Sequence, residues 1–322
     1  MSNTKNQSSK PMDRIRAKIN GDEVVWLDAG NGTELQARGA AMHPDVWCGV
    51  AHVENPQIMQ QIHFDYINAG ADIITTNTFS CNRNMMGPAG LGDQVPESVT
   101  TGVTLAKRAR VQAGAEDRVA IAGSMSHQIP VIKGTSKRIA EAAPRADVAI
   151  ANFSEMAGLL KNAGVDLILL EMMSDPALVI HAQAAAKKTG LPVWMGTCCK
   201  RAESGQLTNY TVPEISFDET CEQLLDTDLD VVGIMHTNID YIDEAITTIR
   251  RYWDGPIMAY PDSGHFTMPD WQFESVIQPQ AYAVRVQKWV DNGVNVIGAC
   301  CGMGVDHLQA CTGGVKSPVT RN

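Results

Sequence analysis

Short runs of apolar residues rich in Val and Ile recur along the chain, and each is followed by a longer segment whose apolar positions have helical spacing. The runs are nearly continuous rather than alternating, which is typical of strands covered on both faces of a parallel sheet. Eight runs are of this kind, at residues 23–30, 71–79, 119–125, 166–173, 192–199, 231–237, 256–262 and 294–301. The pattern therefore predicts eight parallel strands separated by helices.

The intervening segments carry helix start and stop signals. In the clearest case Asn55 is expected to cap a helix that begins at Pro56, and Gly70 is expected to end it. Residues 143–163, 239–253 and 278–292 follow the same plan. The junction NAGADII at 68–74 returns as NAGVDLI at 162–168 and NGVNVI at 292–297, a glycine helix end that leads into a buried strand.

These repeated units predict an α/β fold, a (β/α)8 TIM barrel in a single domain over residues 21–322. A doubly wound open sheet is the alternative, and it is disfavoured because no Gly-x-Gly-x-x-Gly follows the first predicted strand. Residues 1–20 are polar and have no apolar core of a secretory signal, so we expect them to form a flexible N-terminal tail.

Composition narrows the possible partners. The chain has 322 residues and a net charge of −10, which argues against nucleic-acid binding, and no apolar run approaches the length of a membrane span. Eight cysteines without a secretory signal point to a reducing, cytoplasmic location. The sequence is compatible with a homo-oligomer and does not specify the oligomeric state.

Residues that can carry chemistry stand at the ends of the predicted strands. In chain order they are Asp28, Thr76, Asn77, Glu171, Cys198, Cys199, His236, Tyr260, Asp262, Cys300 and Cys301. Cys300, Cys301 and His236 could supply three zinc ligands and leave the fourth position open, as in catalytic zinc sites. The alternative is that Cys300 and Cys301 are inert buried thiols, because zinc motifs usually separate their cysteines by two or more residues.

At these positions the chain resembles the homocysteine S-methyltransferase family, which includes betaine–homocysteine methyltransferase and the homocysteine-binding module of methionine synthase. The similar segments, in order, are LDAGNGTEL at 27–35, ADIITTNTF at 71–79, LLEMM at 169–173, YPDSG at 260–264 and GACCG at 298–302. The resemblance covers residues 24–310, nearly the whole chain, and the fold it implies is the barrel already predicted.

The resemblance also implies a chemistry. Cys300 and Cys301 would bind zinc, while Asp28 and Glu171 would hold the amino group of homocysteine and serve as the catalytic carboxylates. The homocysteine sulfur would then take the open zinc position as a thiolate nucleophile. On the matching motifs, we expect Gly30, Thr76, Asn77 and Tyr260 to line the substrate site.

The sequence departs from the family at the third metal ligand. His236 stands where the family has a cysteine, and Met235 stands where it has an asparagine. Imidazole is a good zinc ligand, so we predict a complete site from two cysteines and one histidine. The alternatives are a histidine satisfied within the core, or Cys199 as a substitute ligand.

The methyl donor is less well specified. Trp47 lies nine residues before Pro56, where betaine-using relatives carry a donor-binding tryptophan, and a methylated cation would stack on its ring, with help from Tyr260 and Phe266. Trp47 could instead only pack on the barrel rim. Ser80 replaces the tyrosine of betaine users, and no Asp-x-His-x-x-Gly cobalamin signature is present. We therefore expect a small onium donor, namely S-methylmethionine, another sulfonium or a betaine.

The leading hypothesis is thus a zinc-dependent methyltransferase that moves a methyl group from a methyl-onium donor to a small thiol acceptor, homocysteine, and forms methionine. Two alternatives keep the same barrel. One is a methyltransferase with a different thiol acceptor. The other is a zinc hydrolase or lyase that uses metal-bound water, with Glu171 or His265 as its general base. A binding protein without catalysis is a third class.

Overall fold

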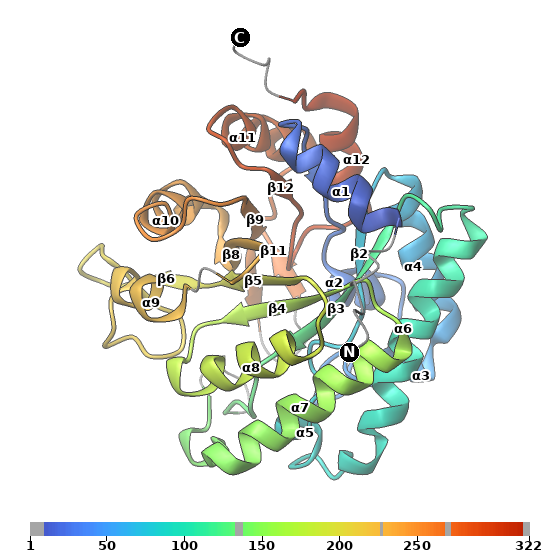
Figure 1. Ribbon diagram of the computed structural model, residues 1–322, viewed down its shortest axis with the longest axis vertical. Coiled ribbons are helices and arrows are strands. Elements are labelled where there is room, and N and C mark those ends of the chain that lie inside the picture. The colour runs from blue at the N-terminus through green and yellow to red at the C-terminus, as the bar shows by residue number, and fades with distance from the viewer. Residues whose placement is uncertain (1–9, 133–137, 226–227, 268–271, 318–322) are drawn as a thin grey trace, which may run out of the picture.

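Eight parallel strands form the centre of the molecule. The structure is a computed structural model, and it describes residues 10–132, 138–225, 228–267 and 272–317. The strand order is β1-β12-β9-β8-β5-β4-β3-β2, and a parallel bridge between Leu27 and Ile73 joins its two ends. Figure 1 shows the helices packed around these strands. The predicted single-domain (β/α)8 barrel is therefore confirmed.

Each barrel strand lies where the apolar runs predict it. The strands are β1 Val25–Trp26, β2 Ile73–Thr75, β3 Ala120–Ser126, β4 Leu167–Met173, β5 Val193–Thr197, β8 Val231–Asn238, β9 Ile257–Asp262 and β12 Val296–Ile297. Two short antiparallel pairs lie outside the barrel sheet, β6 Cys199–Arg201 with β7 Leu207–Asn209, and β10 His265–Thr267 with β11 Gln272–Glu274.

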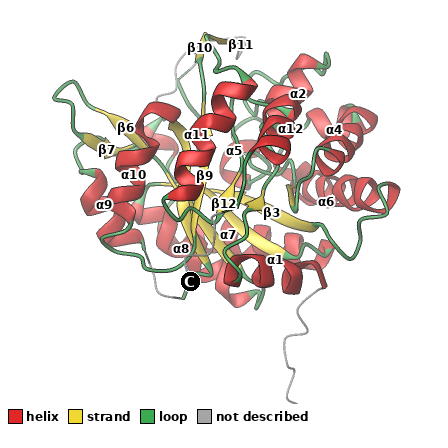
Figure 2. Cartoon of the chain, turned by 90° about the horizontal axis from the view of Figure 1, so that it is seen from above, coloured by secondary structure: helices red, strands yellow, loops and turns green. Residues whose placement is uncertain are grey.

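The helices follow the predicted alternation (Figure 2). They are α1 Lys10–Asn20, α2 Asn31–Ala37, α3 Ala51–Glu54, α4 Pro56–Asn68, α5 Arg83–Met86, α6 Val95–Gln112, α7 Ala146–Ala163, α8 Pro176–Lys188, α9 Phe217–Leu224, α10 Ile242–Ile249, α11 Pro279–Asp291 and α12 Val305–Gly314. Helix α4 begins at Pro56 as predicted, but the side chain of Asn55 donates to the Ala51 carbonyl at 3.2 Å and does not cap the helix.

The repeated junction glycines have the conformation that their role requires. Gly70, Gly164 and Gly293 have φ of 102°, 89° and 84°. Residues with a Cβ rarely adopt this left-handed region, so glycine lets each helix end and the chain enter the next strand directly.

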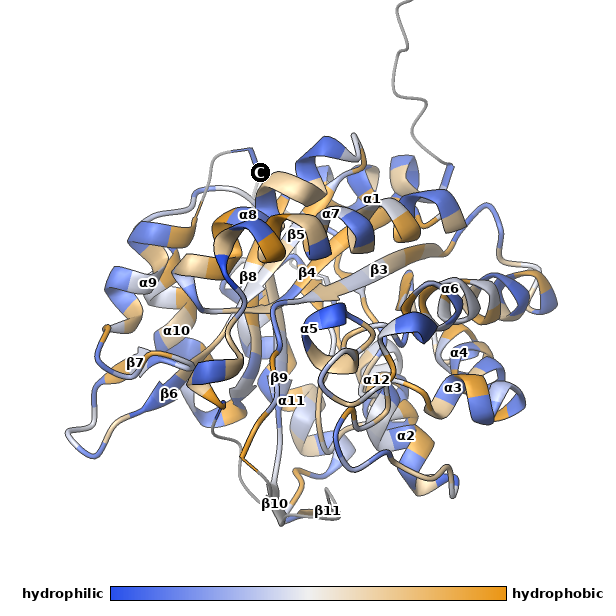
Figure 3. Cartoon of the chain, turned by 90° about the horizontal axis from the view of Figure 1, so that it is seen from below, coloured by the Kyte–Doolittle hydropathy of each residue, from blue (hydrophilic) through white to orange (hydrophobic). Residues whose placement is uncertain are grey.

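Apolar side chains form two layers. The larger layer lies between the helices and the sheet, and it includes Phe153 and Leu160 from the buried face of α7. The smaller layer fills the barrel interior, with Leu167 and Trp194 among its members. In Figure 3 the helices carry hydrophobic and hydrophilic residues on different faces, as expected for helices that cover a barrel.

The expectation of a flexible tail over residues 1–20 is wrong for residues 10–20. These residues form α1, whose Met12 and Ile15 are buried in the interior layer of the barrel. Lys18 also binds the Asp72 carboxylate at 2.6 Å, and Asp72 accepts the backbone N–H of Trp26 at 3.0 Å. Helix α1 lies at the end of the barrel opposite the β10–β11 pair (Figures 2 and 3). It closes the bottom of the barrel.

We expect Ile15→Ala to lower the free energy of unfolding by about 2–4 kcal/mol, because it removes a fully buried side chain from this interior layer. Denaturant unfolding measures the change. Arg14→Ala is the control, since Arg14 is exposed on the same helix, and it should unfold like the parent. An Ile15→Ala variant as stable as the parent would contradict the closing role of α1.

Candidate metal and substrate site

Four potential metal ligands meet at the carboxyl end of the barrel. They are His236 on β8, Asp262 at the end of β9, and Cys300 and Cys301 just after β12, and one ligand atom from each lies within 4.8 Å of the others. The Sγ of Cys300 lies 3.3 Å from Nδ1 of His236 and 3.8 Å from Sγ of Cys301. The three ligands expected from the sequence are therefore side by side. Their soft sulfur and imidazole atoms form a donor set that suits zinc.

The backbone adopts special conformations where it presents these ligands. The pairing of β8 with β9 shifts register between Met235 and Asn238, and His236 within this irregularity has φ of 45°. Non-glycine residues rarely adopt positive φ, and such residues are often found at functional sites. Gly302 has φ of 82°, and a Cβ there would lie 2.1 Å from the Ser263 carbonyl oxygen. The tight turn that follows Cys300 and Cys301 therefore requires glycine.

Glu171 reaches the same cluster from β4. Its Oε1 accepts a hydrogen bond from Nε2 of His236 at 2.8 Å, and its Oε2 accepts one from the Ser124 hydroxyl. The ring of Phe79 stacks on that of His236, with centroids 5.2 Å apart. Burial alone would lower the pKa of His236, but hydrogen bonds with Cys301 and Glu171 outweigh it and hold that pKa well above its usual value.

Asp28 lies fully buried beneath this cluster. Its Oδ2 accepts the backbone N–H of Thr75 at 2.6 Å, and its Oδ1 accepts the Thr75 hydroxyl at 2.9 Å. The Tyr260 hydroxyl lies 3.4 Å from Oδ1. Burial raises the pKa of Asp28 to about 8, and the nearby charge of Glu171 adds to the increase, although the bonds from Thr75 oppose it.

A narrow cavity of about 40 Å³ opens onto the cluster. Three of the potential ligands, His236, Cys300 and Cys301, line it. So do five of the residues expected from the sequence, namely Gly30, Trp47, Thr76, Asn77 and Tyr260. Asn77 is held in place by its amide, which donates to the Cys48 carbonyl and pairs with His52, both at 2.9 Å. The ring of Trp47 packs so closely on Gly32 that a Cβ there would lie 2.3 Å from it.

Neither Cys199, the alternative ligand, nor His127, which follows β3, belongs to the ligand group found in the described part of the chain. Cys199 is buried and its backbone N–H donates to the Thr237 hydroxyl at 3.0 Å. Nε2 of His127 accepts the backbone N–H groups of Ser174 and Asp175 at 2.9 and 3.0 Å, so His127 orders the loop after β4. The side chains of His265 and Phe266 lie outside the described part of the structure.

Sequence reasoning missed Asp262 as a possible ligand. Its position at the end of a strand was noted, but its closeness to His236 and to the cysteines depends on the barrel geometry. Ser124 and Thr75, which hold the two carboxylates, were also missed. Both residues stand on predicted strands, and only the pairing of these strands with their neighbours reveals their partners.

Comparisons with known proteins find related sequences over most of the chain. A family model described as homocysteine S-methyltransferase matches residues 25–313. The chain is 25% identical to homocysteine S-methyltransferase 2 of Arabidopsis thaliana, over 85% of this chain and 88% of that protein. It is also 25% identical to the selenocysteine methyltransferase of Astragalus bisulcatus, over 88% and 90%.

Solved structures share the fold. The metallated form of the homocysteine methyltransferase MmuM from Escherichia coli superimposes with a TM-score of 0.72 at 20% identity, covering 93% of this chain and 99% of that one. In the described residues of the present chain, we find no helix with the length and apolar character needed to span a bilayer.

The buried Asp28 carboxyl should make stability depend on pH. Between its ordinary pKa of 3.8 and the folded value of about 8, the folded protein keeps a proton that the unfolded chain has released. The free energy of unfolding therefore falls as pH rises across this window and levels off above it. Asp28→Asn removes this titration. The free energy of unfolding of this variant, minus that of the parent, should therefore increase from pH 5 to pH 8 in urea unfolding.

Asp93→Asn is the control for this experiment. Asp93 is exposed, so the difference in free energy of unfolding between its variant and the parent should stay constant as the pH changes. A parallel profile for Asp28→Asn as well would show that Asp28 does not hold its proton in the folded protein.

Proposed function

The chain belongs to the homocysteine S-methyltransferase family, and we propose that it moves a methyl group from a small onium donor to the thiolate of homocysteine, forming methionine. The family makes it a methyltransferase of class EC 2.1.1 that acts on small molecules. One observation supports the finer proposal above all others. It is the group of His236, Asp262, Cys300 and Cys301, with ligand atoms within 4.8 Å of one another at the mouth of the barrel.

We propose zinc as the metal and His236, Cys300 and Cys301 as its ligands. When bound there, zinc would act as a Lewis acid that stabilises a substrate thiolate at neutral pH. Relative to the family pattern, His236 replaces a cysteine and so removes a negative charge, whereas Asp262 replaces an asparagine and restores one. The two departures compensate, which supports Asp262 as a fourth member of the site.

Glu171 supports this site through His236. Because Nε2 of His236 donates to Glu171, Nδ1 is left facing Cys300 as the nitrogen that can bind a metal. Carboxylates commonly orient metal-binding histidines in this way and increase their basicity. Ser124 in turn fixes the other oxygen of Glu171.

The same carboxylate faces the substrate cavity, as does Tyr260, while Asp28 lies below. We propose that Glu171 and Asp28 attract the ammonium group of homocysteine. An ammonium group close to Asp28 favours its ionised form, so substrate binding would lower the raised pKa of this carboxyl.

In the transfer step, an electron pair of the acceptor sulfur forms the new bond to the methyl carbon. The bond between that carbon and the positively charged onium atom breaks, and its electrons neutralise the leaving group. No proton moves in this step once the acceptor is a thiolate. The side chains around the cavity contribute by positioning the two reactants in line and by excluding water.

Two alternatives are less well supported. A hydrolase is less well supported because the chain belongs to a family of methyltransferases, and the side chain of His265, one of its two candidate bases, lies outside the described part of the structure. A different thiol acceptor would fit the same metal group. Measuring methyl transfer to homocysteine and to other thiols distinguishes between these acceptors. The expected cytoplasmic location and any homo-oligomer remain predictions.

The direct test incubates the protein with zinc, homocysteine and S-methylmethionine carrying an isotopically labelled methyl group. Labelled methionine detected by mass would support the proposal. Absence of labelled methionine with every onium donor, in a zinc-loaded and folded protein, would contradict it.

We expect about one zinc ion per chain, as for a mononuclear catalytic site, and His236→Ala should lose most of it because an essential ligand is gone. Metal analysis after dialysis measures the content. Cys199→Ala is the matched control and should keep its zinc, since Cys199 is not part of the ligand group. Zinc kept by His236→Ala and lost by Cys199→Ala would show that the ligand set is wrong.

Two changes at Glu171 separate its roles. Glu171→Gln keeps an oxygen that can accept from His236, so zinc content should hold while affinity for homocysteine falls roughly tenfold or more through loss of the charge. Glu171→Ala also removes the support of His236 and should weaken zinc binding about 10–100-fold. Zinc titration and acceptor KM are the readouts, and zinc loss in Glu171→Gln would make Glu171 a direct ligand.

Trp47→Ala should raise the donor KM about thirtyfold and leave acceptor binding nearly unchanged, because a desolvated cation–π contact contributes about 2 kcal/mol. Trp47→Phe should recover part of the loss. Steady-state kinetics at saturating homocysteine gives the donor KM. An alanine variant with the parent's donor KM would leave Trp47 as a packing residue of the rim.

A further inference from the structure

A second and larger pocket lies beside the metal group, on the side of β3, β4 and β5. Its volume is about 450 Å³, against about 40 Å³ for the cavity over the ligands. Residues that follow several strands line it, including Gln128 after β3, Asp175 after β4 and Tyr210 after β7. The small cavity cannot hold two substrates, so the second substrate needs space of this kind.

The pocket adjoins the reaction centre. Met172, which lines it, directly follows Glu171 in β4 and has φ of 60°. Tyr210 also lines the pocket and is half-buried, and the charges of Asp262, Cys198, Cys301 and Cys300 add to the effect of burial in raising its pKa. Gln128 donates to the Met172 sulfur at 3.3 Å and lines the pocket with it, so the pocket borders the end of β4, the strand that carries Glu171.

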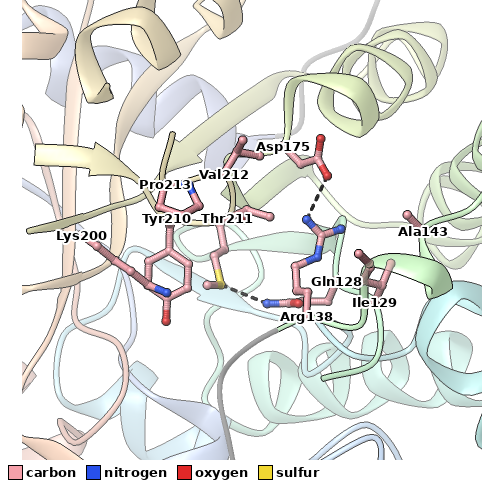
Figure 4. Close-up of a pocket in the computed structure, with 12 residues that line it drawn as sticks. Gln128, Ile129, Arg138, Ala143, Asp175, Lys200, Tyr210, Thr211, Val212 and Pro213 are labelled. Carbon is pink, nitrogen blue, oxygen red and sulfur yellow. Dashed lines mark hydrogen bonds and ion pairs between the residues drawn. The ribbon is translucent and has the colours of Figure 1, made fainter. Parts of the chain in front are cut away.

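The lining carries more positive than negative charge. Arg138 and Lys200 are cationic and Asp175 is anionic, in a chain whose net charge is −10. Figure 4 shows Lys200 lying over Tyr210 on one side of the pocket and Arg138 paired with Asp175 on the other. The Lys200 amine is 3.9 Å from the centre of the Tyr210 ring, and Arg138 binds Asp175 at 2.9 Å.

Arg138 retains capacity to bind a ligand. Its side chain is 13% exposed, and its Nε is buried with no hydrogen-bond partner among the described residues. A buried donor without a partner is costly, and a carboxylate that enters the pocket would relieve this cost by a charge-assisted bond to the guanidinium. The other walls are apolar, with Ile129, Val212 and Pro213 among them, and they suit a short hydrocarbon chain.

We propose that this pocket binds the carboxylate end of the methyl donor, with Arg138 as the residue that recognises it. S-methylmethionine and betaine both carry such a carboxylate, and the inference assigns the residue and the pocket that recognise it. The donor's charged methyl-bearing end lies toward the metal group and Trp47, while its hydrocarbon chain and carboxylate occupy the pocket. This inference rests on the proposed function, because it assigns one end of that function's donor.

The test compares two donors by calorimetry on the zinc-loaded full chain. One is S-methylmethionine, and the other is its decarboxylated counterpart, dimethyl(3-aminopropyl)sulfonium. The parent should bind the first about 10–100-fold more tightly, the range expected for one charge-assisted contact. Arg138→Gln should bind S-methylmethionine more weakly by a similar factor and lose the preference. Removing the donor carboxylate should then cost this variant little further affinity, because both changes delete the same contact.

Arg145→Gln is the matched control, because the Arg145 side chain is 84% exposed, and it should keep the full preference. Lys200→Gln is the second variant, in case loss of the Arg138–Asp175 pair impairs folding, and it should lose part of the preference. A full carboxylate preference in a folded Arg138→Gln variant would overturn the inference while leaving methyl transfer intact. A parent that binds and transfers from neither donor would instead refute the proposed function.

Discussion

The closure of a parallel sheet into a barrel is the constraint on which the rest of this site depends. It brings the carboxyl ends of eight strands to one rim, so residues separated by more than a hundred positions become neighbours. The hydrogen bond between Glu171 on β4 and His236 on β8 crosses β5, which lies between these two strands. Such a contact exists only because the barrel fixes the position and tilt of all three.

The strain at the rim has a direct structural consequence. His236 departs from regular strand geometry, and so does Met172, which follows Glu171. Both irregularities coincide with register shifts in the strands that carry them. The backbone turns away at these points, and the side chains of Glu171 and His236 meet over the barrel interior. The dense packing of the barrel below supplies the stability that holds these unfavourable conformations.

Much of this arrangement could be predicted from the chain because the apolar runs mark strands and the chemistry stands at their ends. Glu171, Cys300 and Cys301 were identified in this way. The role of Asp262 was not, because it follows from distances between strands rather than from any local pattern. Helix α1 was missed since its polar composition hides two buried residues, Met12 and Ile15, at helical spacing.

The central claim is that the sulfurs of Cys300 and Cys301 and a nitrogen of His236 hold a metal and leave it open to a thiol. X-ray absorption at the zinc edge, recorded with and without homocysteine, tests this claim most directly. The account predicts two sulfur ligands with nitrogen or oxygen neighbours before homocysteine is added, and a third sulfur afterwards. Three sulfur ligands in the absence of homocysteine, or an unchanged sulfur count in its presence, would contradict it.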